Sequence, residues 1–161
     1  MQTKEAIAAL WLDRVLRTYP AQTARFLAEE TDPFRNPVGN TFRQALAILV
    51  DELLLGMDHG KVAAALDSIL QIRAVQDLTP GHALEFLVQL KGILRAEDPG
   101  PVLEMLDSRI DEMVLMGFDI YMKYRDRICE VKANEARRRV YVLERALGPR
   151  ETAEWQERVP K

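Results

Sequence analysis

The last third of this chain carries a helical pattern of unusual length, from about Pro101 to Leu147. Apolar or small residues recur there every three or four positions, which is the spacing of a heptad seam. A continuous helix over that range would span roughly 70 Å, at about 1.5 Å per residue, whereas a small domain is only about 30 Å across. We therefore expect the helix either to bend at Gly117, where the spacing stutters, or to leave the domain.

This seam also predicts a contact between two copies of the chain. A heptad-like stripe that is longer than one bundle needs indicates a shared surface. We therefore expect a homodimer. The expected dimer seam consists of Leu103, Leu106, Ile110, Met113, Gly117 and Tyr121.

Helical spacing covers the rest of the chain as well, and strand signals are absent: there is no alternating β-branched run and no Asn-Gly hairpin turn. The pattern predicts helices over about 3–18, 20–30, 41–56, 60–77 and from 79 to the "EDPGP" segment at 97–101. We predict an all-α bundle of about six helices with one very long C-terminal helix, with a globin-like arrangement as one candidate. Residues 1–161 are expected to form a single domain, with a helical extension and tail over about 132–161.

Composition narrows the class of protein. The 161 residues are 48% hydrophobic and 29% charged, as in ordinary soluble proteins. The net charge of −3 argues against nucleic acid or an anionic membrane as the main partner. The longest apolar run, "ALAILV" at 45–50, is far shorter than the roughly 20 residues of a spanning helix. With a single cysteine, no intramolecular disulfide is possible, and we expect a cytoplasmic protein with no membrane insertion.

Residues that commonly carry chemistry are scattered. His59 and His82 have no second His or Cys at ligand spacing, so no metal or cofactor is predicted, although haem at His82 is an open alternative. Arg125 and Arg127 precede Cys129, and cationic neighbours are typical of reactive thiols. Because no histidine lies near it in sequence, a half-buried inert thiol is preferred over a redox sensor. We therefore predict no catalytic residues and no enzyme.

Two groups of charges favour a solvated surface over a site. Asp107 and Asp111 share a helix face, with Glu112 and Asp119 nearby, but the Glu-x-x-His pairs of a di-iron bundle are missing. Residues 122–145 hold eight Lys or Arg and four Asp or Glu. Because the three arginines at 137–139 fan out by about 100° each, they share no face. Docking of an acidic partner on this basic segment is the second interpretation.

The segment "FRNPVGNTF" at 34–42 predicts a rigid turn. Proline fixes φ, glycine permits positive φ, and "TFRQ" at 41–44 fits a capping box that starts the next helix at Thr41. We expect Phe34 to be buried and Asn36 to bond local backbone. The predicted structural turn consists of Phe34, Asn36, Pro37, Gly39 and Thr41.

Arg73 is unusual because it follows Ile69 by four residues and Leu70 by three, on an apolar helix face. A buried guanidinium needs carboxylate or carbonyl partners. We expect Arg73 and Gln76 to anchor the turn at 34–40, with an arginine stem lying along the core as the alternative. A possible ligand pocket would be lined by Trp11, Phe34, Arg73 and Tyr121.

Three phrases together resemble the N-terminal domain family of the RsbT co-antagonist protein RsbRD, over roughly residues 8 to 145. They are "DPFRNPVGNTF", "DSILQIRAVQDLTPGHALEFLVQLKGIL" and "FDIYMKYRDRICEVKANE". The resemblance implies an all-α sensory or interaction module, found before a STAS domain in stress-signalling complexes and not known as an enzyme. Because no such domain follows here, we expect a stand-alone copy.

The resemblance and the residues together predict a non-enzymatic regulatory module that acts through protein–protein contacts. The expected partners are a second copy of the chain and an unknown protein. A small-ligand or cofactor-binding helical bundle is the alternative.

Overall fold

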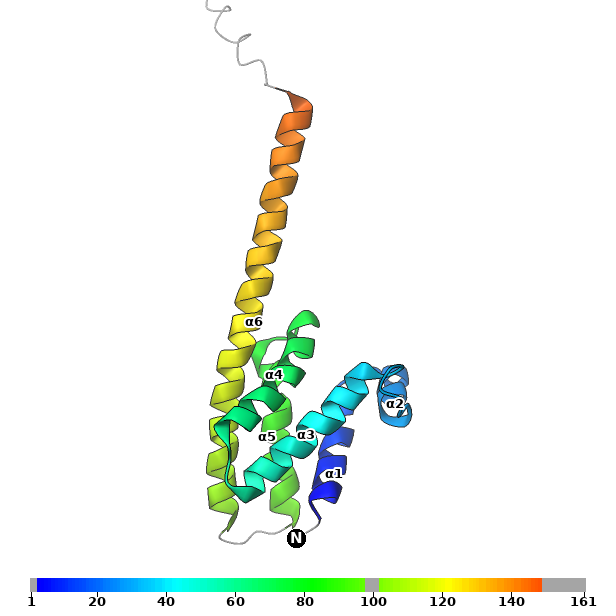
Figure 1. The fold of residues 1–161 in the computed structure, drawn as a ribbon, viewed down its shortest axis with the longest axis vertical. Helices are drawn as coiled ribbons and strands as arrows, with labels where there is room; N and C mark the ends of the chain where they lie inside the picture. Colours follow the sequence, from blue (N-terminus) through cyan, green and yellow to red (C-terminus); the bar gives the residue numbers. More distant parts are fainter. Residues whose placement is uncertain (1–2, 98–101, 149–161) are drawn as a thin grey trace, which may run out of the picture. The chain divides into compact units, whose positions relative to one another are not determined.

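A computed structural model describes residues 3–97 and 102–148 of the chain. These residues form six α-helices and no strand (Figure 1). The helices are α1 (Lys4–Leu16), α2 (Ala21–Glu29), α3 (Pro37–Leu55), α4 (His59–Val75), α5 (Pro80–Glu97) and α6 (Val102–Leu147). The predicted all-α class with a very long C-terminal helix is therefore confirmed. The "EDPGP" segment lies mostly outside the described residues.

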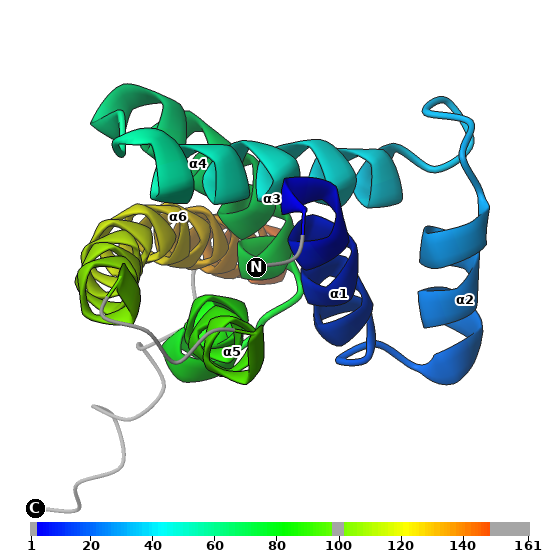
Figure 2. The ribbon, with the colours of Figure 1, turned by 90° about the horizontal axis from the view of Figure 1, so that it is seen from below.

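The chain divides into two compact units, residues 1–125 and residues 126–161. Helix α6 contributes to both. In the first unit α3 packs against α4 and α1, α1 packs against α5, and α2 contacts α1 and α3 (Figure 2). None of the described helices is long and apolar enough to cross a membrane.

The core of the first unit forms where the apolar stripes of its helices meet. Core positions within each helix recur every three or four residues, as the sequence pattern predicts, and some turns add an adjacent residue such as Leu70 beside Ile69. Buried members of these stripes include Phe42, Leu46, Leu49 and Leu53 in α3, Val62, Leu66, Ile69 and Leu70 in α4, and Leu87, Leu90 and Leu94 in α5.

Trp11 joins α1 to α5 at the centre of this core. Its side chain is fully buried, and its ring stacks on Phe86 with centroids 5.8 Å apart. The indole Nε1 donates a hydrogen bond of 2.7 Å to the carbonyl oxygen of Phe86. An indole is buried at low cost only when its N–H has a partner, and this bond supplies one. Trp11 therefore combines a large apolar contact with a fixed orientation of α1 on α5.

Helix α3 begins four residues earlier than the capping box predicts. Asn36 is its N-cap, with the side-chain Oδ1 accepting from Gly39 N at 2.8 Å, and Pro37 occupies the first turn. Thr41 lies inside the helix, where its hydroxyl donates to the carbonyl of Pro37. The prediction of a start at Thr41 was wrong because asparagine followed by proline is itself a strong start signal.

Gly39 matters for space, since its φ is not positive. A Cβ at this position would lie 2.6 Å from the carbonyl oxygen of Leu27 and 2.3 Å from Asn36 Nδ2. The predicted role of Gly39 in permitting positive φ is therefore wrong. Its missing side chain lets the last turn of α2 approach the first turn of α3.

Gly117 also serves close packing. Helix α6 is assigned as helical through this residue without interruption, so the stutter in the spacing does not end it. A Cβ on Gly117 would lie 2.8 Å from Leu84 Cδ2, 3.4 Å from Leu87 Cδ1 and 3.5 Å from Leu70 Cδ1. The glycine therefore allows α6 to lie close against α4 and α5 within the first unit.

Candidate functional site

The turn between α2 and α3 is held together by the side chain of Asn36, which is only 1% exposed. Its Nδ2 donates to the carbonyl oxygens of Leu27 at 3.0 Å and Glu30 at 2.9 Å. The last carbonyls of a helix lack partners within the helix. The two bonds from Nδ2 therefore give the carbonyls at the end of α2 a donor, while Oδ1 caps the start of α3. One asparagine thus ties the end of one helix to the start of the next.

Arg43 reinforces the same junction from the second turn of α3. Its Nη2 lies within hydrogen-bonding distance of three carbonyl oxygens of α2 and the residue after it: Leu27 at 2.7 Å, and Ala28 and Glu30 at 3.0 Å. The anchoring arginine is therefore Arg43, and the expected role of Arg73 in holding this turn is wrong. A signal was present, because Arg43 follows Asn36 by seven residues and so lies on the same helix face.

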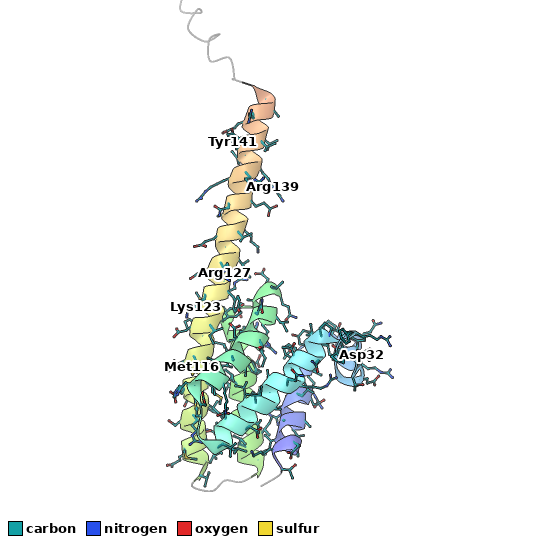
Figure 3. All side chains as sticks on the ribbon, in the orientation of Figure 1. Asp32, Met116, Lys123, Arg127, Arg139 and Tyr141 are labelled. Carbon is teal, nitrogen blue, oxygen red and sulfur yellow. The ribbon has the colours of Figure 1, made fainter. Side chains whose placement is uncertain are left out.

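Phe34 projects from this turn into solvent and is 95% exposed, so the prediction that it is buried is wrong. The polar side chain of Asn36 occupies the inside of the turn in its place. The backbone around Phe34 is nevertheless fixed. Phe34 N donates to Asp32 Oδ1 at 2.9 Å, and Asn36 N donates to the Asp32 carbonyl at 2.9 Å. Asp32 lies at the outer corner between α2 and α3 (Figure 3).

Arg73 is buried far along α4, near the start of α5. Its Nη1 donates to the carbonyl oxygens of His82 at 3.0 Å and Ala83 at 3.4 Å, and its guanidinium carbon lies 5.1 Å from the centre of the Phe86 ring. Burial lowers the pKa of this guanidinium, and interactions with Tyr19 and Glu85 partly offset that effect. Arg73 therefore positions the N-terminal turn of α5.

A cavity of about 680 Å³ lies beside Arg73. Its walls come from the α1–α2 connection, α2, the end of α4 and the start of α5. They are formed by Thr18, Tyr19, Pro20, Thr23, Arg73, Gln76, Leu78, His82 and Glu85. Gln76 makes its hydrogen bond to Tyr19 and not to the turn at 34–40: its Oε1 accepts from the Tyr19 hydroxyl at 3.0 Å.

The structure does not bring together the four residues of the predicted ligand pocket. Arg73 alone of the four lines this cavity. Trp11 and Tyr121 are fully buried, and their polar atoms donate to the carbonyls of Phe86 and Leu78. Phe34 is in solvent. Large aromatic residues at helical spacing became core, whereas the cavity formed where helix ends meet.

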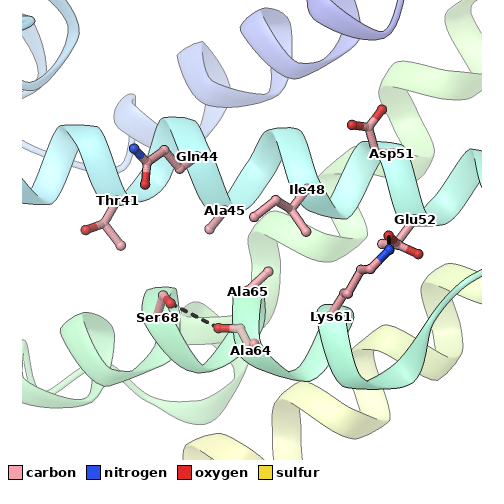
Figure 4. Close-up of a pocket in the computed structure, with 10 residues that line it drawn as sticks. All are labelled: Thr41, Gln44, Ala45, Ile48, Asp51, Glu52, Lys61, Ala64, Ala65 and Ser68. Atoms are coloured by element: carbon pink, nitrogen blue, oxygen red, sulfur yellow. Dashed lines mark hydrogen bonds and ion pairs between the residues drawn. The ribbon is translucent and has the colours of Figure 1, made fainter.

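A second hollow, of about 540 Å³, lies between α3 and α4 (Figure 4). Its floor carries small side chains, Ala45 and Ala65, and its end carries the pair of Glu52 and Lys61 at 3.1 Å. Glu52 also accepts from Asp58 N at 3.0 Å, so both of its oxygens support the α3–α4 connection. The hydrogen bond to Glu52 raises the pKa of Lys61. This pair therefore holds α3 and α4 together at their connection.

Most residues of the predicted dimer seam are buried inside the first unit. Leu106, Ile110, Met113, Gly117 and Tyr121 are all buried there, and Leu103 is half-buried. This seam is therefore not available for a second copy of the chain. A heptad pattern has the same appearance whether a helix packs on its own bundle or on another chain, which is why the sequence did not distinguish the two.

The remaining candidates have ordinary partners. His59 Nε2 lies 2.6 Å from Glu112 Oε1, Asp107 pairs with Arg95, and Asp111 pairs with Lys91. The described residues contain no cluster of three or more groups that could hold a metal. His82 is exposed in the first turn of α5, and Cys129 is exposed, in contrast to the half-buried thiol that the sequence predicts.

The second unit consists, in its described part, of the exposed end of α6. Arg139 pairs with Glu135 at 2.5 Å, and Arg137 approaches Asn134 at 3.3 Å, so two of the three consecutive arginines have neighbours on their own helix. Large apolar side chains are exposed as well: Val131, Val140, Tyr141, Val142, Leu143 and Leu147. Arg139 and Tyr141 both project from the helix (Figure 3).

This fold defines an all-α helical module with an exposed aromatic residue on a turn that Asp32, Asn36 and Arg43 hold by hydrogen bonds. The family comparison agrees with that class. The model of the RsbT co-antagonist protein rsbRD N-terminal domain matches residues 5–136, and the chain belongs to this family. Membership implies a role in the regulation of stress-response signalling. No curated protein matches the chain, and no solved structure matches it.

Proposed function

We propose that this chain is a non-enzymatic regulatory module that binds a protein partner through the turn at Phe34. The observation that carries this proposal is that the Phe34 ring is exposed while the backbone beneath it is held in place. A side chain that is 95% exposed stands on a backbone held by Asp32, Asn36 and Arg43. Burying a ring on binding contributes most when little conformational freedom is lost.

The surroundings of Phe34 also suit a protein contact. Glu30 pairs with Arg35 at 3.4 Å, and Arg25 pairs with Glu29 at 3.0 Å, so charged side chains both precede and follow Phe34 in sequence. Phe26 on α2 is also about half exposed. The residues that contribute most to binding at an interface are commonly aromatic and are surrounded by a polar rim.

A photo-crosslinking amino acid at position 34 is the direct test of a partner. We expect one discrete protein adduct from native extract, and no such adduct from the same probe at Leu55, which is 71% exposed at the end of α3. The adduct identifies the protein with which affinity is then measured. Equal labelling of unrelated proteins from both positions would contradict a docking role for the turn.

Phe34→Ala is expected to weaken binding to that purified partner by about tenfold to a hundredfold, because a central aromatic residue commonly contributes roughly 1.4–2.8 kcal/mol. Isothermal titration calorimetry measures the effect. Stability should change by less than about 0.5 kcal/mol, since the ring contacts solvent in the free chain. Leu55→Ala removes a similarly exposed apolar side chain and should leave affinity unchanged. Unaltered binding by Phe34→Ala would place the interface elsewhere.

We further propose that two copies pair through the second unit, because the seam of the first unit is buried. Residues 133, 136, 140, 143 and 147 are all exposed and are separated by alternating steps of four and three. They are alanines followed by Val140, Leu143 and Leu147. Valine and leucine at alternate heptad positions favour a two-stranded parallel coil.

Leu143→Glu is expected to shift such a dimer to monomer, because it places two carboxylates face to face in an apolar seam. Sedimentation equilibrium at high micromolar concentration measures the change. Arg138→Glu, on another face of the helix, is the control and should remain dimeric. A wild-type chain that is monomeric at these concentrations would end this part of the proposal.

A further inference from the structure

Arg73 has hydrogen-bonding capacity that the described chain does not use. Three polar or charged side chains are buried among the described residues: Asn36, Glu52 and Arg73. Both polar atoms of Asn36 and both oxygens of Glu52 have partners. In contrast, Nε and Nη2 of Arg73 are buried without a partner in the described structure. A buried donor left without a partner is destabilising, and more so when it is charged, which favours a partner from outside the chain.

The unused donors have the geometry of a carboxylate receptor. Nε and Nη2 lie along one edge of the planar guanidinium, and this edge can donate two parallel hydrogen bonds to the two oxygens of one carboxylate. The rest of the guanidinium is fixed, because Nη1 bonds the carbonyls of His82 and Ala83 and the Phe86 ring lies within 5.1 Å. The edge is therefore oriented before any ligand arrives.

We propose that the cavity beside Arg73 binds a small organic monocarboxylate, whose two oxygens accept hydrogen bonds from Arg73 Nε and Nη2. The cavity, of about 680 Å³, is large enough for such a molecule. Tyr19, Pro20 and Leu78 contribute apolar wall for the body of the ligand. This site is separate from the Phe34 turn, so it goes beyond the proposed function and can fail independently of it.

Glu85 limits the charge of the ligand. Its side chain lines the same cavity, and its charge acts on the Arg73 guanidinium. A second negative charge on the ligand would be repelled by this carboxylate, so dicarboxylates and phosphate fit less well. An ammonium group would instead be attracted, which makes amino acids a permitted subset of the class.

Entry of the carboxylate needs a small movement, because Nε and Nη2 are closed to solvent. The hydrogen bond from the Tyr19 hydroxyl to Gln76 joins two walls of the cavity and is itself exposed. An exposed hydrogen bond adds little net stability because water can replace it, so opening it costs little.

Heteronuclear NMR of the nitrogen-labelled full chain tests the proposal through the Nε–H signal of Arg73. The probes are acetate, butyrate, hydrocinnamate and phenylalanine, with hydrocinnamide as the neutral isostere and phosphate as the multiply charged control. We expect at least one monocarboxylate to shift this signal saturably and the amide to have no effect. No shift with any monocarboxylate up to about 50 mM, or an equal shift with the amide, would overturn the proposal and leave a structural guanidinium.

Two variants separate binding from folding. Arg73→Lys keeps the charge but lacks the two-donor edge, and affinity should fall about tenfold or more. Because this substitution is buried, Thr23→Trp is the second variant: residue 23 is exposed and lines the cavity, so an indole there should block binding in a chain that folds normally. Full binding by Thr23→Trp would place the ligand elsewhere. Phe34→Ala should bind the carboxylate like wild type, which distinguishes this site from the docking turn.

Discussion

Trp11→Ala is expected to destabilise the first unit by about 4 kcal/mol, because deleting a large buried aromatic side chain typically costs roughly 3–5 kcal/mol. The substitution removes a fully buried indole, its stacking on Phe86 and its 2.7 Å hydrogen bond to the Phe86 carbonyl. Domains of this size are stable by only about 5–15 kcal/mol, so a large share would be lost. The midpoint of urea unfolding, followed by far-ultraviolet circular dichroism, measures it.

Phe34→Ala is the matched control for this experiment, since it also deletes an aromatic ring but from a side chain that is 95% exposed. Its free energy of unfolding should stay within about 0.5 kcal/mol of wild type. Trp11→Phe should fall between the two, because it keeps most of the apolar contact and loses the N–H donor. A loss below about 1 kcal/mol for Trp11→Ala would mean that α1 is not packed on α5 as described.

Asn36→Ala is expected to cost about 3 kcal/mol. It removes the N-cap of α3, which is typically worth about 1 kcal/mol, and leaves the buried carbonyls of Leu27 and Glu30 with fewer donors, at about 1 kcal/mol each. Urea unfolding measures the loss. Arg43 still contacts both carbonyls, so the turn should loosen without unfolding the whole unit.

Asn40→Ala is the control for the cap. Asn40 is the same residue type four positions later, is half-buried, and makes one marginal side-chain contact of 3.5 Å with Gln44. Its loss should cost less than about 0.5 kcal/mol. Equal effects of the two substitutions would show that α3 does not depend on Asn36 for its start. Asn36→Asp should recover the cap but not the two donated bonds, because a carboxylate only accepts.

The presence of each helix could be predicted because it depends on the spacing of apolar residues that are close in sequence. The stripes of α3, α4 and α5 follow from residues three and four apart, and α3 ends at Leu55 with Gly56 as its C-cap, next to the predicted end at 56. The start of the same helix was not predicted, because two cap signals compete within six residues. Asn36 wins for a reason that is partly distant in sequence: its Nδ2 also satisfies Leu27 and Glu30.

The candidate sites were less predictable, because each depends on a partner from another helix. The burial of Arg73 follows from its place on an apolar face, but its bonds to His82 and Ala83 depend on how α5 is placed against α4. The exposure of Phe34 follows from the polar Asn36 filling the turn. Hydrophobicity alone favours burial of phenylalanine and therefore indicates the opposite.

The sequence by itself determined the helical class, the approximate number of helices among the described residues, the family and the residues that would be unusual, since periodicity, proline, glycine and motif spacing are local properties. Only the tertiary structure decided what those residues do. Arg43 took the anchoring role expected of Arg73, the α6 seam was buried within its own unit, and a cavity formed where helix ends meet. The physical reason is that a carbonyl, an apolar stripe or a guanidinium accepts any suitable partner, and packing decides which partner is within reach.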